Sequence, residues 1–368
     1  MVKRKSNIEL LRIVSMLLII SFHYVLKSGY VYNELDLNTF IVKLFYHFGE
    51  LGVNLFILIS GYFLIKGKFS YKKLILLLVE VLFYQAFIYT ICYFAGIYHY
   101  TSFRDLIFVI FPTIFAQYWF ITAYVLLYLL SPFLNKFANS LDQNTYKKFL
   151  LLLLFIWSFI PTVFGIFHNT SEDLLYYNRF IWFIVLYFTA GYIRLYGFNI
   201  FKKRKNTLLI AGICFSLIII SIFTIHYFRK SFELLGLTEI AYFWPPNSIL
   251  VFGLSISIFY LFLNMNIKSS RIINILASTT LGVYILHDND FNKYMWTNIF
   301  KTKERLNSNF SILYILISTL IIYLCFSLID LIRQLIEKQT IKRILNSRLF
   351  DKIVNKIKLI FSKILGAI

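Results

Sequence analysis

Apolar stretches long enough to cross a membrane recur along the whole chain and limit the folds open to it. About 20 apolar residues span a hydrocarbon core, where helices satisfy their own backbone hydrogen bonds. The pattern predicts an all-α polytopic membrane bundle of about ten transmembrane helices, at 7–27, 40–65, 74–98, 118–135, 147–167, 180–197, 207–227, 247–265, 272–288 and 309–334. Residues 103–115 are too few to span beside their neighbour, so we expect an interfacial or re-entrant piece there.

Composition supports this class and the basic residues predict its orientation. Charged residues make up 15% of the chain, against about 25% in a typical soluble domain. Lys and Arg are more frequent in alternate loops, starting with the N-terminal segment, which predicts a multi-pass cell-membrane protein with both termini in the cytoplasm. The net charge of +20 is then an orientation signal and an attraction to membrane lipid, and no nucleic-acid partner is expected.

No linker or internal repeat divides the chain. Residues 1–336 are expected to form one transmembrane domain, and 337–368 to form a basic amphipathic helix lying on the cytoplasmic leaflet. The three cysteines fall in separate apolar segments without metal-ligand spacing, so neither a metal site nor a permanently bound cofactor is expected.

Arg12 and His23 share the first apolar segment. Eleven positions are close to three helical turns, so both side chains should lie on one face, with about 16 Å of rise between them. Polar groups inside a membrane segment usually face a bundle interior, which predicts a protein-lined cavity along this face. A neutral imidazole is the usual general base near neutral pH, so His23 is a candidate catalytic residue.

Three motifs follow one another along the chain. The first is Arg12 followed after ten residues by His23. The second is Gly-Val-Asn-Leu-Phe-Ile-Leu-Ile-Ser-Gly-Tyr-Phe at 52–63, and the third is Ser-Thr-Thr-Leu-Gly-Val-Tyr-Ile-Leu-His at 278–287. Together they resemble the acyltransferase 3 family of integral membrane O-acyltransferases over nearly the whole chain. Asn54 stands where that family usually has aspartate, which puts a role for charge at this position in doubt.

The resemblance implies a donor and an acceptor. Acetyl-CoA would be the donor substrate, supplied from the cytoplasm, and the acceptor would be a hydroxyl of an extracytoplasmic glycan in a bacterial capsule, exopolysaccharide or cell wall. Arg12 could bind donor phosphates or a carbonyl through its fixed charge. Lys72 and Lys73 stand where the family often has two arginines and could bind phosphates, although ordinary positive-inside lysines explain them equally well.

His23 would accept the proton of the sugar hydroxyl while its oxygen attacks the thioester carbonyl. Candidate donors to the developing oxyanion are Arg12, Asn54, Ser60 or a tyrosine, and His287 is a further candidate for this role or for acceptor binding. An acyl-histidine intermediate is an open alternative to direct transfer.

Acidic residues of the second and third apolar segments have two interpretations each. His47, Glu50 and Asn54 form one polar stripe. Glu50 could orient His23 as the third group of a triad does, or could simply satisfy His47. Glu80 is expected to pair with Arg12 within the bundle or to contact the donor, with the structural role favoured.

Aromatic clusters lie near the predicted outer interface. Most such residues anchor the protein in the interface, and Trp119 and Arg179 are the candidates for binding a sugar ring. The alternative function is a polysaccharide polymerase or flippase without acyl transfer, but the outer loops are short for that class. A secondary transporter would be expected to show inverted repeats, which the sequence lacks. A homo-oligomer is compatible with these features.

Overall fold

The computed structural model describes residues 5–30, 36–97, 102–115, 117–164, 178–228, 245–289 and 294–339, with parts of 347–359. All regular elements in these ranges are helices. Of the predicted amphipathic helix at 337–368, the structure describes residues 337–339, 347, 348, 350–352, 354–356 and 359, and the rest lies outside the described residues.

Seven helices of the described chain are long and apolar enough to cross a membrane, so the protein is a multi-pass membrane protein. Each of them corresponds to a predicted span. They are α1 (Ser6–Leu26), α2 (Leu37–Leu64), α3 (Tyr71–Phe94), α5 (Trp119–Ser140), the continuous α6–η1–α7 helix (Gln143–Leu154, Phe155–Phe159 and Ile160–Phe164), α9 (Arg204–Tyr227) and α16 (Ser311–Gln339).

The other three predicted spans are shorter than expected. Residues 180–197 form α8 (Arg179–Leu195, 17 residues), and 247–265 form the apolar helix α11 (Ile249–Leu263, 15 residues). Residues 272–288 form two helices of 8 residues each, α12 (Arg271–Ser278) and α13 (Thr280–His287). Of the about ten transmembrane helices predicted, the described residues thus support an all-α bundle with seven candidate spans and one shorter apolar helix.

Local chemistry explains where these helices stop. The hydroxyls of Ser278, Thr279 and Thr280 donate to backbone carbonyls three residues earlier, at 2.7, 2.7 and 3.0 Å, and such bonds compete with the helical ladder. Before α11, the paired prolines at 245–246 lack backbone N–H groups, so the helix begins only after Ser248.

Four short elements complete the described chain. The predicted short piece at 103–115 is an eight-residue helix followed by a turn, and it is not one of the candidate spans. These elements are α4 (Phe103–Ile110), the 3₁₀ turn η3 (Asn199–Lys202), the π-helical turn η4 (Met295–Ile299) and α15 (Thr302–Leu306).

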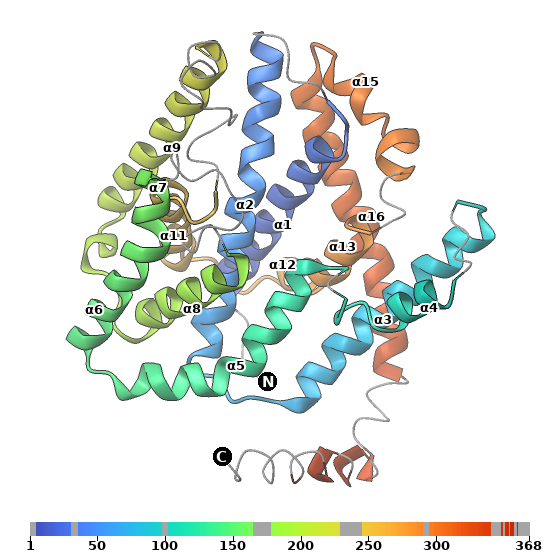
Figure 1. Cartoon of the computed structure of the whole chain (residues 1–368), viewed down its shortest axis with the longest axis horizontal. Coiled ribbons are helices and arrows are strands. Elements are labelled where there is room, and N and C mark those ends of the chain that lie inside the picture. Colours follow the sequence, from blue (N-terminus) through green and yellow to red (C-terminus); the bar gives the residue numbers. More distant parts are fainter. Residues whose placement is uncertain are drawn as a thin grey trace.

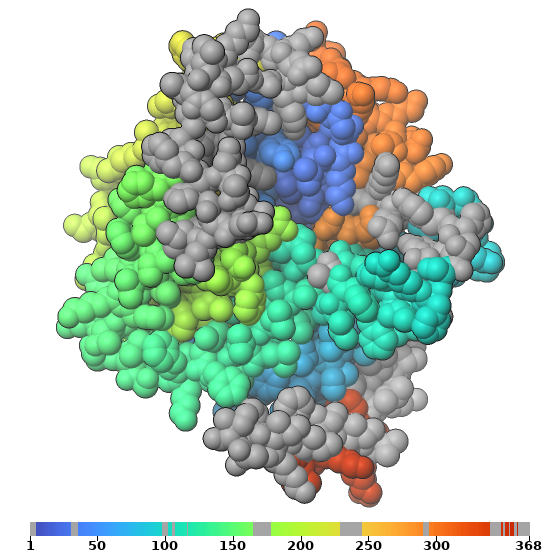
Figure 2. Space-filling model, in the orientation of Figure 1, coloured from blue at the N-terminus to red at the C-terminus, as the bar shows by residue number. Residues whose placement is uncertain are grey.

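Helices α1 and α2 occupy the middle of the bundle, with α9 and α11 on one side and α13 and α16 on the other (Figure 1). Helices α3 and α4 project away from α2 beside α16. The first turn of α1 and the last turn of α16 lie towards the same end of the molecule. On the face shown in Figure 2, blue atoms of the N-terminal helices come to the surface between green and orange segments.

Two glycines of α2 allow α1 to approach closely. A Cβ added at Gly52 would lie 2.5 Å from the backbone oxygen of Ser15, and one added at Gly49 would overlap the side chain of Phe22. Small residues permit such close backbone approach in membrane bundles. The glycine that opens the 52–63 motif therefore has a packing role.

We expect Gly52→Ala and Gly212→Ala to shift stability in opposite directions. Alanine is favoured over glycine inside a helix by about 1 kcal/mol, and a Cβ at Gly212 on α9 would meet nothing within 4 Å. At Gly52 overpacking against the α1 backbone should cost about 3 kcal/mol, the upper end of the usual range, because the added Cβ meets a backbone oxygen, and this outweighs the gain. Thermal unfolding of the detergent-solubilised variants should show a lowered midpoint for Gly52→Ala alone. Equal midpoints would contradict the tight crossing.

Candidate active site

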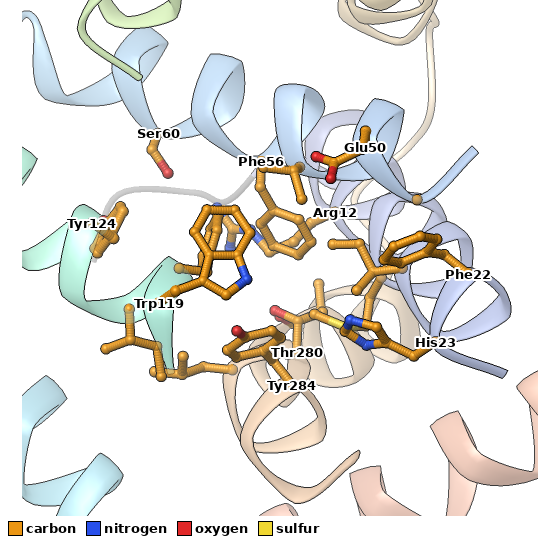
Figure 3. A pocket seen from close by; sticks show the side chains of 18 of the residues that line it. Arg12, Phe22, His23, Glu50, Phe56, Ser60, Trp119, Tyr124, Thr280 and Tyr284 are labelled. Atoms are coloured by element: carbon orange, nitrogen blue, oxygen red, sulfur yellow. The ribbon is translucent and has the colours of Figure 1, made fainter. Parts of the chain in front are cut away.

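A cavity of about 420 Å³ lies between α1, α2, α3, α5 and the α12–α13 break, with the first residue of α8 at its edge. On α1 its wall includes Arg12, Met16, Ile19 and His23, which are spaced as one face of a helix. Figure 3 shows Arg12 and His23 among the side chains around this space. The prediction that these two residues share a face bordering one cavity is confirmed.

His23 is held by a second histidine that the third motif supplies. Its Nδ1 lies 2.9 Å from Nε2 of His287, and Nδ1 of His287 lies 2.7 Å from the carbonyl oxygen of Val283. A carbonyl only accepts, so Nδ1 of His287 carries the hydrogen and, in the neutral ring, Nε2 accepts one. His23 therefore donates from Nδ1, and the hydrogen-bond network assigns a free lone pair to its Nε2.

A carboxylate stands on the other side of the His23 ring. Oδ1 of Asp288 lies 4.0 Å from Nε2 of His23 and 2.6 Å from Nζ of Lys27. Neither Asp288 nor Lys27 was predicted from the sequence to belong to the site. Two signals were available, because Asp288 directly follows the motif histidine and Lys27 stands one helical turn after His23.

The predicted pairing of Glu80 with Arg12 is wrong. Glu80 forms an ion pair with Arg333 of α16, at 2.9 Å, while Arg12 pairs with Glu9 one turn earlier on α1, also at 2.9 Å. Arg333 additionally binds Asp330 and Glu337 at 2.7 and 2.6 Å. Because α16 supplies its own buried cation, the carboxylate of Glu80 has a closer partner than Arg12.

Asn54 is not on the cavity wall, which removes it as an oxyanion candidate. Its amide nitrogen donates to the carbonyl of Pro246 at 2.8 Å and to the Ser255 hydroxyl at 3.2 Å, and its oxygen accepts from the indole N–H of Trp182 at 2.9 Å. The side chain is fully buried, with both ends of the amide engaged. A carboxylate could not donate to Pro246, which gives a physical reason for asparagine here.

Glu50 lines the cavity, but the Nδ1 hydrogen bond of His23 goes to His287. The orienting contact, which was one of two alternatives for Glu50, is therefore made by His287. Arg179 is close enough to Glu50 to interact electrostatically, and its guanidinium lies 4.2 Å from the ring centre of Trp119. Arg179 and Trp119 both border the cavity, as their candidate role in acceptor binding requires.

The remaining candidates divide between the wall and the surface. Ser60 borders the cavity, close to Tyr124 (Figure 3). Lys72 and Lys73 lie in the first turn of α3 and do not reach the wall, which α3 borders through Leu77 and Glu80. Within the described residues no group of three or more His, Cys, Asp or Glu side chains could hold a metal ion.

Comparison with known protein families identifies an acyltransferase domain of the acyltransferase 3 family over residues 5–330. Comparisons with curated proteins and with solved structures find no significant match. The matched region covers most of the chain and all of the helices that form the cavity. The chain therefore belongs to the acyltransferase 3 family and is an integral membrane acyltransferase.

Proposed function

We propose that the protein moves an acetyl group from cytoplasmic acetyl-CoA to a hydroxyl of an extracytoplasmic glycan, such as a capsule, exopolysaccharide or cell-wall polysaccharide. One observation carries the proposal: Arg12 and His23 lie on the wall of a single cavity, and the network leaves a lone pair on Nε2 of His23. Membership of an acyltransferase family favours this activity over a polymerase or flippase.

Arg12 and His23 are too far apart along α1 to act on the same atom of the substrate. Eleven residues correspond to about 16 Å of helix rise, whereas a donor to an oxyanion must come within about 3 Å of it. This separation supports a role for Arg12 in holding the phosphates or pantetheine arm of the donor rather than the reacting carbonyl. With the N-terminus in the cytoplasm, as the basic residues predict, Arg12 lies at the inner end of the cavity.

Bond formation takes place beside His23. The acceptor oxygen attacks the thioester carbonyl carbon while Nε2 of His23 takes the hydroxyl proton. The tetrahedral intermediate then expels the CoA thiolate, which receives that proton, so the products are an ester and free CoA. Asp288 stabilises the transient imidazolium, and Tyr284, on the cavity wall beside His287, is the proposed donor to the oxyanion.

The same nitrogen could instead attack the thioester. This acyl-histidine route differs from direct transfer in one observable, because the labelled acetyl group would stay on the protein when no acceptor is present. Acid-quenched protein incubated with labelled acetyl-CoA distinguishes the two routes.

We expect His23→Ala and Arg12→Ala to act on different kinetic constants. Loss of the base should lower kcat by about 100-fold or more. Loss of the guanidinium should chiefly raise KM for acetyl-CoA, by about 10- to 100-fold, since a hydrogen bond to a charged group contributes about 1.5–3 kcal/mol. Both are measured as labelled acetate transferred from acetyl-CoA to membrane glycan.

The control for Arg12→Ala is Arg204→Ala, which removes an exposed arginine at the start of α9. Its kinetic constants should equal those of the wild type. Wild-type transfer by His23→Ala protein that accumulates normally in the membrane would contradict the proposed function.

A graded series at His287 tests the positioning of His23. His287→Ala removes the acceptor for the Nδ1 hydrogen of His23 and should lower kcat about 10- to 100-fold, with KM for acetyl-CoA unchanged. His287→Gln keeps a side-chain carbonyl that can accept this hydrogen and should recover part of the rate. Equal activity of the two variants would show that the hydrogen bond does not orient the base.

A further inference from the structure

Arg12 and His23 define a length along the cavity. Both belong to one uninterrupted helix, α1, in which eleven residues correspond to about 16 Å of rise. Every Cα–Cβ bond of a helix tilts towards its N-terminus, so the two side chains keep about this separation. In Figure 3, Ser60 and Tyr124 lie at the opposite end of the space from His23, and Tyr124 interacts electrostatically with Arg12. A substrate that contacts both Arg12 and His23 must therefore be long and extended.

The phosphopantetheine arm of coenzyme A has this length. Thirteen bonds separate its phosphorus atom from its sulfur atom, and an extended backbone covers about 3.3–3.6 Å for every three bonds, so the arm spans about 14–16 Å. When the thioester lies beside His23, the phosphate that ends the arm reaches Arg12. The nucleotide that follows this phosphate then lies farther out.

Arg12 has hydrogen-bonding capacity for that phosphate. A guanidinium carries five N–H groups, and within the described residues Arg12 uses one of them, since Nη1 donates to Oε2 of Glu9 at 2.9 Å. Glu9 is not on the cavity wall, whereas the side chain of Arg12 borders the cavity and is 26% exposed. The remaining N–H groups suit phosphate oxygens, which guanidinium groups bind in pairs.

The cavity suits the arm and is small for the whole coenzyme. Along its length α1 contributes Met16 and Ile19 and α2 contributes Val53 and Phe56, apolar side chains that can pack on the methyl and methylene groups of the arm. The volume of about 420 Å³ is near the lower end of the range for drug-sized ligands, about 300–1,000 Å³. The nucleotide contributes about half of the non-hydrogen atoms of acetyl-CoA, so the arm fits this volume better than the complete donor does.

We propose that the protein recognises its donor through the acylated phosphopantetheine arm, with Arg12 on the phosphate of the arm and the nucleotide outside the cavity. The inference rests on the proposed function and deepens it, because the donor class becomes phosphopantetheine thioesters, of which acetyl-CoA is one member. With acetyl-4′-phosphopantetheine the thioester C–S bond breaks, the ester C–O bond forms, and the hydroxyl proton passes through His23 to the released thiolate. Arg12 is a specificity-determining residue in this arrangement.

The test compares three donors that differ only beyond the pantetheine unit, in the full-length, detergent-solubilised protein. Acetyl-CoA, acetyl-4′-phosphopantetheine and acetyl-pantetheine, each labelled in the acetyl group, are supplied with membrane glycan, and kcat/KM is measured for the ester formed. Acetyl-4′-phosphopantetheine should equal acetyl-CoA within about threefold, the effect of one weak hydrogen bond. Acetyl-pantetheine, which lacks the phosphate, should be about 10- to 100-fold poorer, the range for a hydrogen bond to a charged group.

Arg12→Ala shows whether the phosphate contacts this residue. It should lower kcat/KM about 10- to 100-fold for both phosphorylated donors but not for acetyl-pantetheine, so that the ratio of acetyl-4′-phosphopantetheine to acetyl-pantetheine falls to about one. This ratio is independent of how much protein is active, so a folding defect cannot imitate the result. Arg204→Ala, which removes an exposed arginine at the start of α9, is the matched control and should keep the wild-type ratio.

Three results overturn the proposal and leave the proposed function standing. One is transfer from acetyl-CoA with poor transfer from acetyl-4′-phosphopantetheine, which would place the nucleotide in the binding site. Another is wild-type use of acetyl-pantetheine as efficiently as acetyl-CoA. The last is an unchanged donor ratio in Arg12→Ala, which would place the phosphate on other residues. Protein that transfers acetate from none of these donors overturns the proposed function itself.

Discussion

The hydrocarbon surrounding this bundle supplies no hydrogen-bond partners, so polar groups inside it must satisfy one another. Arg333 forms ion pairs with three carboxylates, and Asp288 forms one with Lys27. Asn54 is hydrogen-bonded through both its amide nitrogen and its amide oxygen. Against this background, groups that border the cavity with unused hydrogen-bonding capacity stand out. Nε2 of His23 is such a group, and it lies beside the close crossing of α1 and α2.

The crossing of α1 and α2 connects packing to chemistry. Glycines at 49 and 52 bring the backbones together, and the residues that follow them, Glu50 and Val53, border the cavity. Helix α13, which follows the break, contributes the other half of the site, because it ends at His287 and is capped by Asp288. The close α1–α2 crossing and the α12–α13 break thus determine where His23 and its partners lie.

Periodicity along single helices could be predicted from the sequence, and contacts between helices could not. The shared face of Arg12 and His23 follows from eleven residues of one helix and is present in the structure. The partner of Glu80 is 253 positions away, at Arg333, and depends on how α3 packs against α16. No local pattern distinguishes Arg333 from Arg12 as that partner.

The helix break was predictable in principle. Three consecutive hydroxyl residues at 278–280 are a local signal, but the apolar pattern on either side favoured one continuous span. The role of Asn54 was not predictable, since its partners come from two other helices and a proline turn. The polar residues of the interior could be predicted from the sequence, but which of them face the cavity depends on how the helices pack against one another.

The most direct measurement is an experimental structure of the protein with a non-hydrolysable acetyl-CoA analogue bound. The account predicts the acyl carbonyl beside Nε2 of His23 and the phosphates or pantetheine arm at the Arg12 end of the same cavity. An analogue that binds with its acyl group away from His23, or outside the cavity altogether, would contradict it.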